Sequence, residues 1–269
     1  MVKALIVAHY HPQGKVREDT LELLDKLNTF YEKIIFISTC LDSAQANRLP
    51  KNIEVLVREN YGYDFYSYRQ GIMQLYSTYG VWSNLTELAL MNTSFLCVKS
   101  NILMEQFFAK DVGANVCLGL TKSTAIDEHV QSYLLRFGSD ILGDKRFLDW
   151  WDRMVPLSDR QQVINQYEIG LSQQLSSFGH RLEATYHHWN FIPDALRKKF
   201  LYCDEQMLYQ INLKFGALHY HWNNLFNQYG IIKIEVLKSN PEKVNLKPLN
   251  IAINNSQMLL KYVTEGLSN

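Results

Sequence analysis

Hydrophobic residues in the first half of the chain occur either in short continuous runs or at helical spacing. The helical spacing predicts helices over residues 16–31 and 65–80, the second ending near Gly80. The continuous runs predict buried strands at residues 3–10, 32–40, 52–60 and 85–95. This order of elements predicts an α/β fold with a mostly parallel sheet flanked by helices.

The second half of the chain has a less regular pattern. Residues 127–142 fit either a helix or a strand with a glycine break, and Gly179 is a C-terminal cap for a helix over 159–179. Further helices are predicted at 147–154 and 204–229, and further strands at 114–123, 180–188 and 231–238. Without a repeat or a clear linker, the sequence predicts one domain with a C-terminal helical extension.

Polar, turn-rich segments follow the four predicted strands of the first half: HYHPQG, STCLDS, RENYGYD and MNTS. Ligands of such sheets bind at the carboxyl ends of the strands, so we expect a site there. In RENYGYDFYSYRQGI (58–72), Gly62 permits a turn, and Asn60 and Asp64 can bind a ribose or a base. Arg58 or Arg69 could pair with a phosphate. The alternative is a turn that caps the helix, with tyrosines packed in the core.

Composition narrows the function classes. The 269 residues are 47% hydrophobic with a formal net charge of zero, which argues against a nucleic-acid-binding surface. The four cysteines have no CxxC spacing, and Cys97 and Cys117 lie in apolar runs typical of buried thiols. Dinucleotide, P-loop and nucleophile-elbow motifs are absent. The first apolar run is too short for a signal peptide and no run approaches a membrane span, so we expect a cytoplasmic protein, with attachment to the inner face of the cell membrane through a partner left open.

A second candidate segment is QYEIGLSQQLSSFGHRLEATY (166–186). Glu168, Leu171 and Leu175 fall at helical spacing, which predicts Glu168 near the start of a helix that buries its leucines. The helix dipole would there keep the carboxylate ionised, as a general base requires. A carboxylate without chemistry is the alternative, and Asp127 and Glu128 are rival bases.

Together these segments resemble a known family. The Glu-x-x-Leu-Ser helix and the Asn60-x-Gly62 segment with Arg69-Gln70-Gly71-Ile72 resemble motifs of inverting glycosyltransferases with the GT-A fold. The chain is most similar to the rhamnan synthesis protein F family of bacterial polysaccharide glycosyltransferases. The matching segments lie in order along the chain: ENYGYDFYSYRQGI (59–72), LALMNTSF (88–95), LGLTKS (118–123), HVQSYLLRF (129–137), VINQYEIGLS (163–172), LHYHWNNLF (218–226) and IIKIEVLKSNP (231–241).

The resemblance implies an enzyme with the GT-A fold that transfers a sugar with inversion. It implies L-rhamnose from dTDP-rhamnose as the donor, and a glycan or lipid-linked glycan of a growing cell-surface polysaccharide as the acceptor. Residues 1–125 would bind the nucleotide sugar and residues 126–269 would face the acceptor, within a single glycosyltransferase-like domain over 1–269. Glu168 would be the base, with Asp127, His129 and Gln131 on the acceptor side. The donor-binding residues would be His9, Asn60, Gly62, Asp64, Arg69, Asn92, Thr93 and Ser94.

The resemblance also implies a divalent metal on a D-x-D motif, and here the sequence differs. Asn92-Thr93-Ser94 occupies that place without a carboxylate, and neutral oxygens alone bind Mg²⁺ or Mn²⁺ poorly. We therefore expect weak or absent metal dependence. His219 and His221 would share one face of a strand and could ligate a metal, and either could contact the diphosphate. His9 and His11 have the same ambiguity.

Two alternative functions remain, and the role of the tryptophans is undecided. The missing aspartate favours a non-catalytic nucleotide- or glycan-binding module of a polysaccharide assembly complex, and a phosphosugar transferase is a weaker alternative. Four tryptophans either stack on sugar rings or pack in the core: Trp150, Trp151, Trp189 and Trp222.

Overall fold

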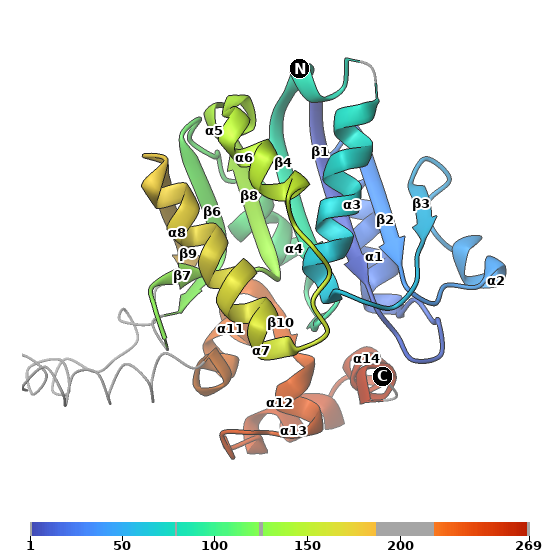
Figure 1. Ribbon diagram of the computed structural model, residues 1–269. Coiled ribbons are helices and arrows are strands. Elements are labelled where there is room, and N and C mark those ends of the chain that lie inside the picture. Colours follow the sequence, from blue (N-terminus) through green and yellow to red (C-terminus); the bar gives the residue numbers. More distant parts are fainter. Residues whose placement is uncertain (1, 79, 124–125, 187–217, 268–269) are drawn as a thin grey trace, which may run out of the picture.

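A mixed sheet of mostly parallel strands lies at the centre of the computed structural model, which describes residues 2–78, 80–123, 126–186 and 218–267 (Figure 1). Its spatial order is β3-β2-β1-β4-β8-β6-β7, with β9 beside β6. The strands are β1 (Val2–His9), β2 (Lys33–Ser38), β3 (Glu54–Val57), β4 (Leu85–Asn92), β6 (Val116–Ser123), β7 (His129–Val130), β8 (Leu134–Gly138) and β9 (Arg181–Tyr186). β1 to β4 run parallel, and β8 is antiparallel to β4 and β6. The predicted α/β fold with a mostly parallel sheet is confirmed.

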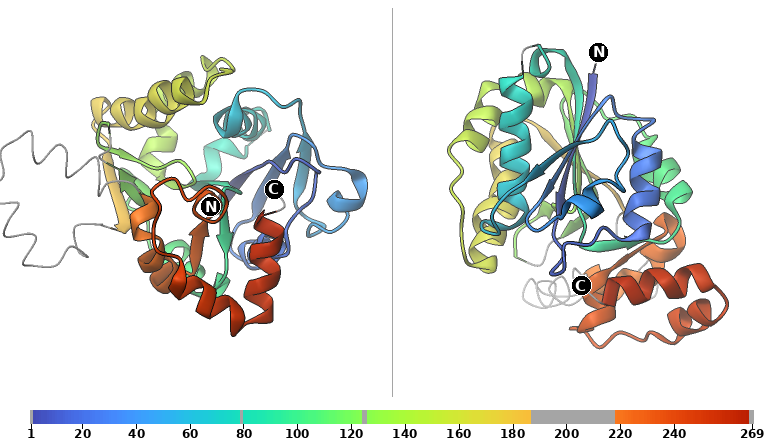
Figure 2. Two further views of the ribbon diagram at one scale, coloured as in Figure 1. Left: turned by 90° about the horizontal axis from the view of Figure 1, so that it is seen from below. Right: turned by 90° about the vertical axis from the view of Figure 1, so that its right-hand side faces the viewer.

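Helices cover both faces of this sheet (Figures 1 and 2). One face carries α1 (Glu18–Leu27) and α4 (Ser100–Leu103), which continues as a π-helical segment (Met104–Phe108). The other face carries α3 (Tyr63–Ser77), α5 (Ser139–Gly143), α6 (Lys145–Asp152), α7 (Arg160–Val163) and α8 (Gly170–Ser177). A short helix, α2 (Ser43–Ala46), follows β2.

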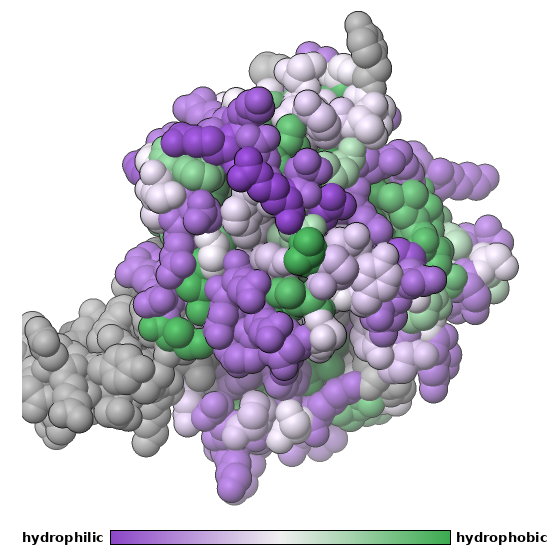
Figure 3. All heavy atoms as spheres, viewed as in Figure 1, coloured by the Kyte–Doolittle hydropathy of each residue, from purple (hydrophilic) through white to green (hydrophobic). Residues whose placement is uncertain are grey.

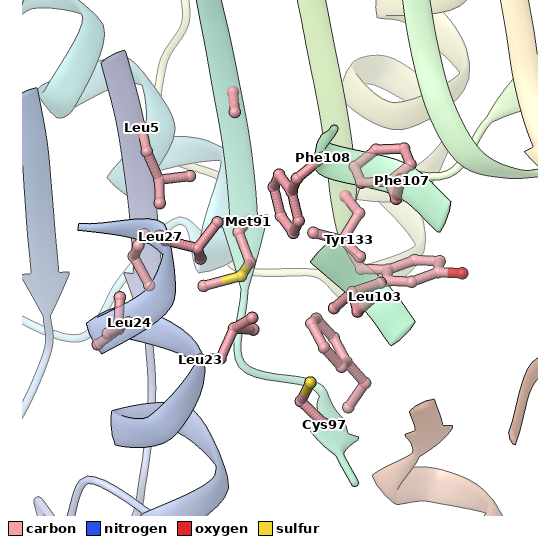
Figure 4. Packing of buried hydrophobic residues seen from close by; sticks show 14 of the residues in the cluster. Leu5, Leu23, Leu24, Leu27, Met91, Cys97, Leu103, Phe107, Phe108 and Tyr133 are labelled. Atoms are coloured by element: carbon pink, nitrogen blue, oxygen red, sulfur yellow. The ribbon is translucent and has the colours of Figure 1, made fainter. Parts of the chain in front are cut away.

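The apolar runs in the strands build two cores because successive side chains point to opposite faces. Leu5 and Val7 of β1 face α1, whereas Ala4 and Ile6 face α3. Figure 4 shows Leu23, Leu24 and Leu27 of α1 packed beside Leu5 and Met91, with Phe107 and Phe108 across the cluster. On the opposite face, the surface over α3, α6 and α8 is mostly hydrophilic with separate apolar patches (Figure 3). The helices therefore present amphipathic faces, as their sequence spacing predicts.

Residues 160–177 form one continuous helix with a π-helical segment at its centre (Ile164–Ile169), between α7 and α8. Asp159 caps its first turn by accepting a hydrogen bond from the backbone N–H of Gln162. Gly179 follows its end with φ of 90°. The predicted helix over 159–179 is confirmed, but Glu168 lies in the π-helical segment, two turns from the start. The expectation that the N-terminal dipole acts on Glu168 is therefore wrong, because that effect is confined to the first turn.

The C-terminal part forms a helical extension on a small second sheet. β5 (Phe95–Cys97) pairs antiparallel with β10 (Ile231–Lys233). The helices are α11 (Trp222–Tyr229), α12 (Ile234–Lys238), α13 (Lys247–Asn254) and α14 (Gln257–Leu267). The predicted strand over 231–238 is wrong after Lys233, because β5 offers only three paired residues and α12 begins at Ile234. Figures 1 and 2 show this extension at the carboxyl ends of the central strands.

The burial of side chains tests the predictions for the cysteines and tryptophans. Cys97 and Cys117 are buried free thiols, as predicted, and Trp151 and Trp222 belong to the cores. Trp189 and the first part of the predicted helix over 204–229 lie outside the described residues. Among the helices that the structure describes, none has the length and apolar character to cross a membrane.

Candidate active site

The turn after β4 is built around Asn92. Its side-chain Oδ1 accepts hydrogen bonds from the backbone N–H of Ser94 at 3.1 Å and from the Ser94 hydroxyl at 2.7 Å. Its Nδ2 donates to Oδ2 of Asp64 at 2.6 Å. Asn92 is buried whereas Ser94 is exposed. The MNTS turn and the start of α3 are both candidate segments for binding the sugar donor. The side-chain amide of Asn92 therefore joins them.

A buried arginine, Arg17, hydrogen-bonds the backbone of this turn. Arg17 donates to the backbone carbonyls of Thr93 at 3.1 Å and Phe95 at 2.7 Å. Asp19 pairs with Arg17 at 2.9 Å and accepts the backbone N–H of Cys97 at 2.8 Å. Both side chains are buried. Because ionic hydrogen bonds fix the backbone on both sides of Ser94, the turn is held in one geometry.

The Asp64 carboxyl group faces a second carboxylate. Burial raises the pKa of Asp64, the hydrogen bond from Asn92 opposes this, and the charge of Glu168 raises the pKa further. Oδ1 of Asp64 also accepts the backbone N–H of Phe65 at 3.1 Å in the first turn of α3. Asp64 and Glu168 are 104 positions apart in the sequence, yet they interact electrostatically. The structure thus brings the two segments together at one site.

Glu168 is anchored through one of its two oxygens. Oε1 accepts hydrogen bonds from the backbone N–H of Ser132 at 2.7 Å and from the Ser132 hydroxyl at 2.9 Å. Within the described ranges, Oε2 has no hydrogen-bond partner, and the side chain is half-buried. Tyr68 donates to the carbonyl of Ser132 at 3.0 Å, so α3 holds the anchoring residue in place. A carboxylate with one fixed and one free oxygen suits a proton acceptor.

Lys233 brings a positive charge to the same place from the end of β10. Its Nζ donates to the Ser94 hydroxyl at 3.2 Å and lies 3.6 Å from the centre of the Tyr133 ring. Burial lowers the pKa of Lys233 to about 8, although the carboxylates of Glu168, Asp64 and Glu235 oppose the shift. Lys233 is half-buried. The cluster of Asp64, Asn92, Ser94, Glu168 and Lys233 is called the polar cluster below.

The loop of RENYGYD is shaped by Arg58, which points into the loop rather than toward a ligand. Its Nε donates to the Ser67 hydroxyl at 2.9 Å. Its terminal nitrogens donate to the backbone carbonyls of Glu59, Tyr61 and Tyr63. Arg58 is buried and these bonds use four of its five N–H donors. Arg58 therefore organises the loop and has little capacity left for a phosphate.

Gly62 is needed where this loop enters α3. It has φ of 73°, and a Cβ there would lie 2.6 Å from Cβ of Tyr66 and 3.0 Å from Cβ of Pro156. We expect Gly62→Ala to lower the free energy of unfolding by about 1–3 kcal/mol, since both the backbone and the contacts resist a side chain. Urea denaturation measures this change.

Gly143 provides the control for Gly62. A Cβ at Gly143 meets no atom within 4 Å, and the residue ends helix α5. Gly143→Ala should leave the free energy of unfolding unchanged or raise it by up to about 1 kcal/mol. Equal effects of the two substitutions would contradict the role given to Gly62.

Three other residues predicted to bind the sugar donor, Arg69, His9 and Asn60, have no hydrogen bond or ion pair with the polar cluster within the described residues. Arg69 donates to the carbonyl of Asp152 at 2.9 Å and faces its carboxylate at 3.6 Å, so it binds the end of α6. His9 is buried, and its ring nitrogens contact the Ser38 hydroxyl at 2.8 Å and the Lys15 carbonyl at 3.0 Å. Asn60 is exposed in the loop. Arg69 and His9 therefore have structural partners, and their predicted contacts with the donor stay predictions.

The residues predicted on the acceptor side, Asp127, His129 and Gln131, lie in the segment that precedes Ser132. The Gln131 side chain accepts from the Thr121 hydroxyl at 2.9 Å, and a ring nitrogen of His129 lies 2.7 Å from the carbonyl of Asp127. Asp127 is exposed, and its carboxylate accepts from Gln173 at 3.2 Å. Glu128 pairs with Lys122. Both rival bases thus have partners of their own on the surface, whereas Oε2 of Glu168 has no hydrogen-bond partner within the described ranges.

The two late histidines do not form a metal site in the described residues. They lie on a 3-10 helix (Leu218–His221) and not on a strand, so residues two apart diverge. His219 contacts the Glu235 carboxylate at 3.5 Å, and His221 packs against the Tyr186 ring at 5.9 Å. Across the described ranges, no three His, Cys, Asp or Glu side chains are grouped to hold a metal ion.

Trp150 lies at a surface pocket beside the π-helical segment. The pocket has a volume of about 400 Å³, and Tyr167 and Arg153 also line it. Trp150 contacts the Tyr167 ring edge-on at 6.0 Å. Of the four tryptophans, Trp150 is thus the one in the described chain that is placed for contact with a ligand, and its stacking on a sugar stays a prediction.

The sequence reasoning missed Lys233, Ser132 and Arg17. Lys233 lies in a predicted strand and in a segment that resembles the family, but no role is predicted for it, although a lysine within IIKIEVLK is a charge in a buried run. Ser132 and Arg17 carry no motif. Their roles depend on the pairing of distant segments, which single positions do not reveal.

Two sequence comparisons cover most of the chain. The sequence model of the rhamnan synthesis protein F family matches residues 34–223. The uncharacterized protein y4gN of Sinorhizobium fredii (strain NBRC 101917 / NGR234) is 26% identical over 230 residues, which cover 83% of this chain and 58% of that protein. The chain therefore corresponds to somewhat more than half of this curated relative.

Solved structures with similar folds have low sequence identity. A putative nucleotide-diphospho-sugar transferase from Desulfovibrio desulfuricans G20 has a TM-score of 0.40 at 11% identity, covering 68% of this chain and 78% of its own. The galactosyltransferase LgtC, in complex with donor and acceptor sugar analogs, has a TM-score of 0.38 at 7% identity, covering 62% and 71%. A 4-diphosphocytidyl-2C-methyl-D-erythritol synthase has a TM-score of 0.40 at 12% identity, covering 68% and 88%.

Proposed function

Because the chain belongs to the rhamnan synthesis protein F family, we propose that it is a glycosyltransferase that moves a sugar from a nucleotide-sugar donor to a glycan acceptor. The donor sugar proposed is L-rhamnose, carried by dTDP, and the acceptor is a growing cell-surface polysaccharide. The observation that supports this proposal is the polar cluster, where the carboxylate of Glu168, whose Oε2 has no hydrogen-bond partner among the described residues, interacts with Asp64 and Lys233.

The donor lies across the turn after β4 in this proposal. Asp64 and Asn92 are joined by a 2.6 Å hydrogen bond at the carboxyl end of the sheet, where nucleotides bind in α/β folds. Ser94 is exposed beside them. Their carboxyl, amide and hydroxyl groups provide both donors and acceptors for a ribose or a phosphate.

The reaction is a single displacement with inversion. The acceptor hydroxyl oxygen forms a bond to the anomeric carbon while the bond from that carbon to the diphosphate breaks, and the diphosphate keeps the electron pair. The acceptor proton passes to Oε2 of Glu168. Ser132 holds Oε1 with two hydrogen bonds, which keeps the carboxylate oriented during the transfer.

A donor screen tests this function. We expect dTDP-rhamnose to raise the melting temperature more than UDP-glucose, UDP-galactose or the free sugars. Specific binding at a hundredfold excess over Kd stabilises the folded state by about 2.7 kcal/mol. Donors that bind are then incubated with the protein, and release of free dTDP or UDP is measured.

The outcomes separate the alternatives. Slow donor hydrolysis with release of the nucleoside diphosphate supports a glycosyltransferase. Binding without any release favours the non-catalytic binding module, and release of a monophosphate favours a phosphosugar transferase. The anomeric configuration of a transferred sugar, read by NMR, decides between inversion and retention.

A further inference from the structure

Lys233 is placed in the polar cluster by backbone pairing. The register of β10 on β5 sets Lys233 opposite Phe95, and the backbone N–H of Ile234 donates to the carbonyl of Ser94 at 3.0 Å. The ammonium group consequently lies over the turn after β4, at 3.2 Å from the Ser94 hydroxyl. Lys233 lies beyond residues 34–223, the range that the family model matches, although the segment IIKIEVLKSNP (231–241) takes part in the sequence resemblance.

The resemblance to GT-A enzymes implied a divalent metal at this turn, and the residues present do not fit one. Within the described residues, Asp64 is the one carboxylate hydrogen-bonded to the side chain of Asn92, and the Asn92 oxygen is already bonded to Ser94. Mg²⁺ is usually bound by one or two carboxylates together with substrate phosphates, but both oxygens of Asp64 already accept hydrogen bonds, from the Asn92 amide and the backbone N–H of Phe65. The Lys233 ammonium beside the turn would also repel a metal cation.

The surroundings of Lys233 leave it able to bind an anion. Among the described residues it forms no ion pair, and its partners are one hydroxyl and one aromatic ring. An ammonium has three N–H donors, so at least one is free for a ligand. A structural lysine gains most from a bonded carboxylate, and burial without one is costly.

On the basis of the proposed function, we infer that the Lys233 ammonium takes the part of a divalent cation: it binds the diphosphate of the donor and stabilises it as it leaves. A cation that approaches the leaving oxygen lowers the barrier by balancing charge that develops in the transition state. No proton needs to be transferred from Lys233, because a nucleoside diphosphate is a stable anion. Because the Lys233 ammonium supplies the positive charge, nucleotide binding is independent of added metal.

The pKa of Lys233, lowered to about 8, predicts that affinity for the diphosphate depends on pH. The charged groups that act on the ammonium are Glu168 and Asp64 in the polar cluster, Glu235 on α12 and Arg160 on α7. Below about pH 8 the group is protonated in the free protein and ready to bind a diphosphate. As the pH rises through this value, binding requires uptake of a proton, so affinity for the diphosphate falls.

Calorimetric titration with dTDP, UDP, thymidine and uridine tests the inference, in EDTA and in Mn²⁺. We expect wild-type affinity for the diphosphates to differ less than about twofold between EDTA and Mn²⁺. Lys233→Gln should weaken diphosphate binding about 10–100-fold, which matches the loss of one charge-assisted hydrogen bond, and should leave nucleoside binding unchanged. Lys233→Arg should restore much of the affinity and remove its decline above pH 8, since arginine stays protonated.

Lys238→Gln is the matched control, because Lys238 is an exposed lysine at the end of α12. The inference is overturned if Mn²⁺ raises wild-type affinity tenfold or more, if Lys233→Gln binds as the wild type does, or if Lys238→Gln weakens binding equally. Lys233→Arg keeps the test informative if Lys233→Gln fails to fold. A wild-type protein that binds none of the diphosphates would instead overturn the proposed function, and this inference with it.

Discussion

Glu168→Gln is expected to lower sugar transfer about 10²–10⁴-fold, the range that general-base catalysis contributes. Donor affinity should change less than about threefold, because the substitution removes basicity but not shape. The proton of the acceptor hydroxyl would then have no acceptor at the position of Oε2. Steady-state kinetics and donor titration measure the two quantities separately.

The hydrogen bonds that anchor Glu168 are retained in the Glu168→Gln variant. Oε1 of Glu168 accepts from the N–H and the hydroxyl of Ser132, and a glutamine oxygen can accept both bonds. The glutamine NH₂ then replaces Oε2, which has no hydrogen-bond partner in the described part of the chain. We therefore expect the variant to fold with the same stability as the wild type.

Glu105→Gln is a suitable control because Glu105 is an exposed glutamate in the other π-helical segment. It should transfer sugar at the wild-type rate. If Glu168→Gln keeps full turnover, the base is a different group, and Asp64→Asn and Asp127→Asn then identify it. Asp64 is a candidate because its raised pKa shows that it holds a proton more readily than an ordinary aspartate.

The sequence pattern predicted the central elements because each depends on local spacing. The apolar runs of β1 and β2 are continuous, β4 contains the run LALM (88–91), and the leucines of α1 and α8 are spaced for one buried face. The predicted helix over 159–179 is confirmed, but Glu168 lies in its central π-helical segment and not near its start. The anchor for Glu168 is Ser132, whose position depends on the pairing of β6, β7 and β8.

Contacts between distant segments account for what the pattern did not predict. β5 and β10 are three residues each, and their pairing joins positions more than 130 residues apart. No periodicity can be read from three residues, so Lys233 was invisible as a site residue. Likewise, Arg58 and Arg69 are equivalent in the sequence, but the structure directs one into the loop and the other to α6.

Arg136→Met is expected to lower the free energy of unfolding by about 3–5 kcal/mol, the usual cost of leaving one buried charge without its partner. Arg136 is fully buried in β8, and it contacts both oxygens of Glu87 at 2.8 and 2.9 Å. It also donates to the carbonyl of Phe107 at 2.6 Å, while Tyr31 donates to Glu87 at 2.8 Å. Chemical denaturation measures the loss.

The pH dependence of this loss follows from Glu87. Burial alone would raise the pKa of Glu87, but hydrogen bonds and charge from Arg136 hold it below its usual value. The wild type therefore gains stability above the unfolded pKa and loses it as the pH falls through the folded pKa. In Arg136→Met, burial acts unopposed by Arg136 and the carboxyl group binds a proton more readily. The difference between the two proteins should thus be greatest near pH 7 and smaller in acid.

A double variant separates the lost pairing from a simple packing defect. Adding Glu87→Gln to Arg136→Met removes the buried charge that has lost Arg136 and is left with Lys3 at 3.4 Å, and it keeps an oxygen that can accept the bond from Tyr31. We expect it to recover about half of the loss or more, because a neutral amide costs less to bury than a carboxylate. Arg181→Met breaks an exposed pair with Glu183 and should cost less than about 1 kcal/mol. A double variant no more stable than Arg136→Met, at every pH, would mean that the guanidinium acts through its shape and its bond to Phe107 rather than through its charge.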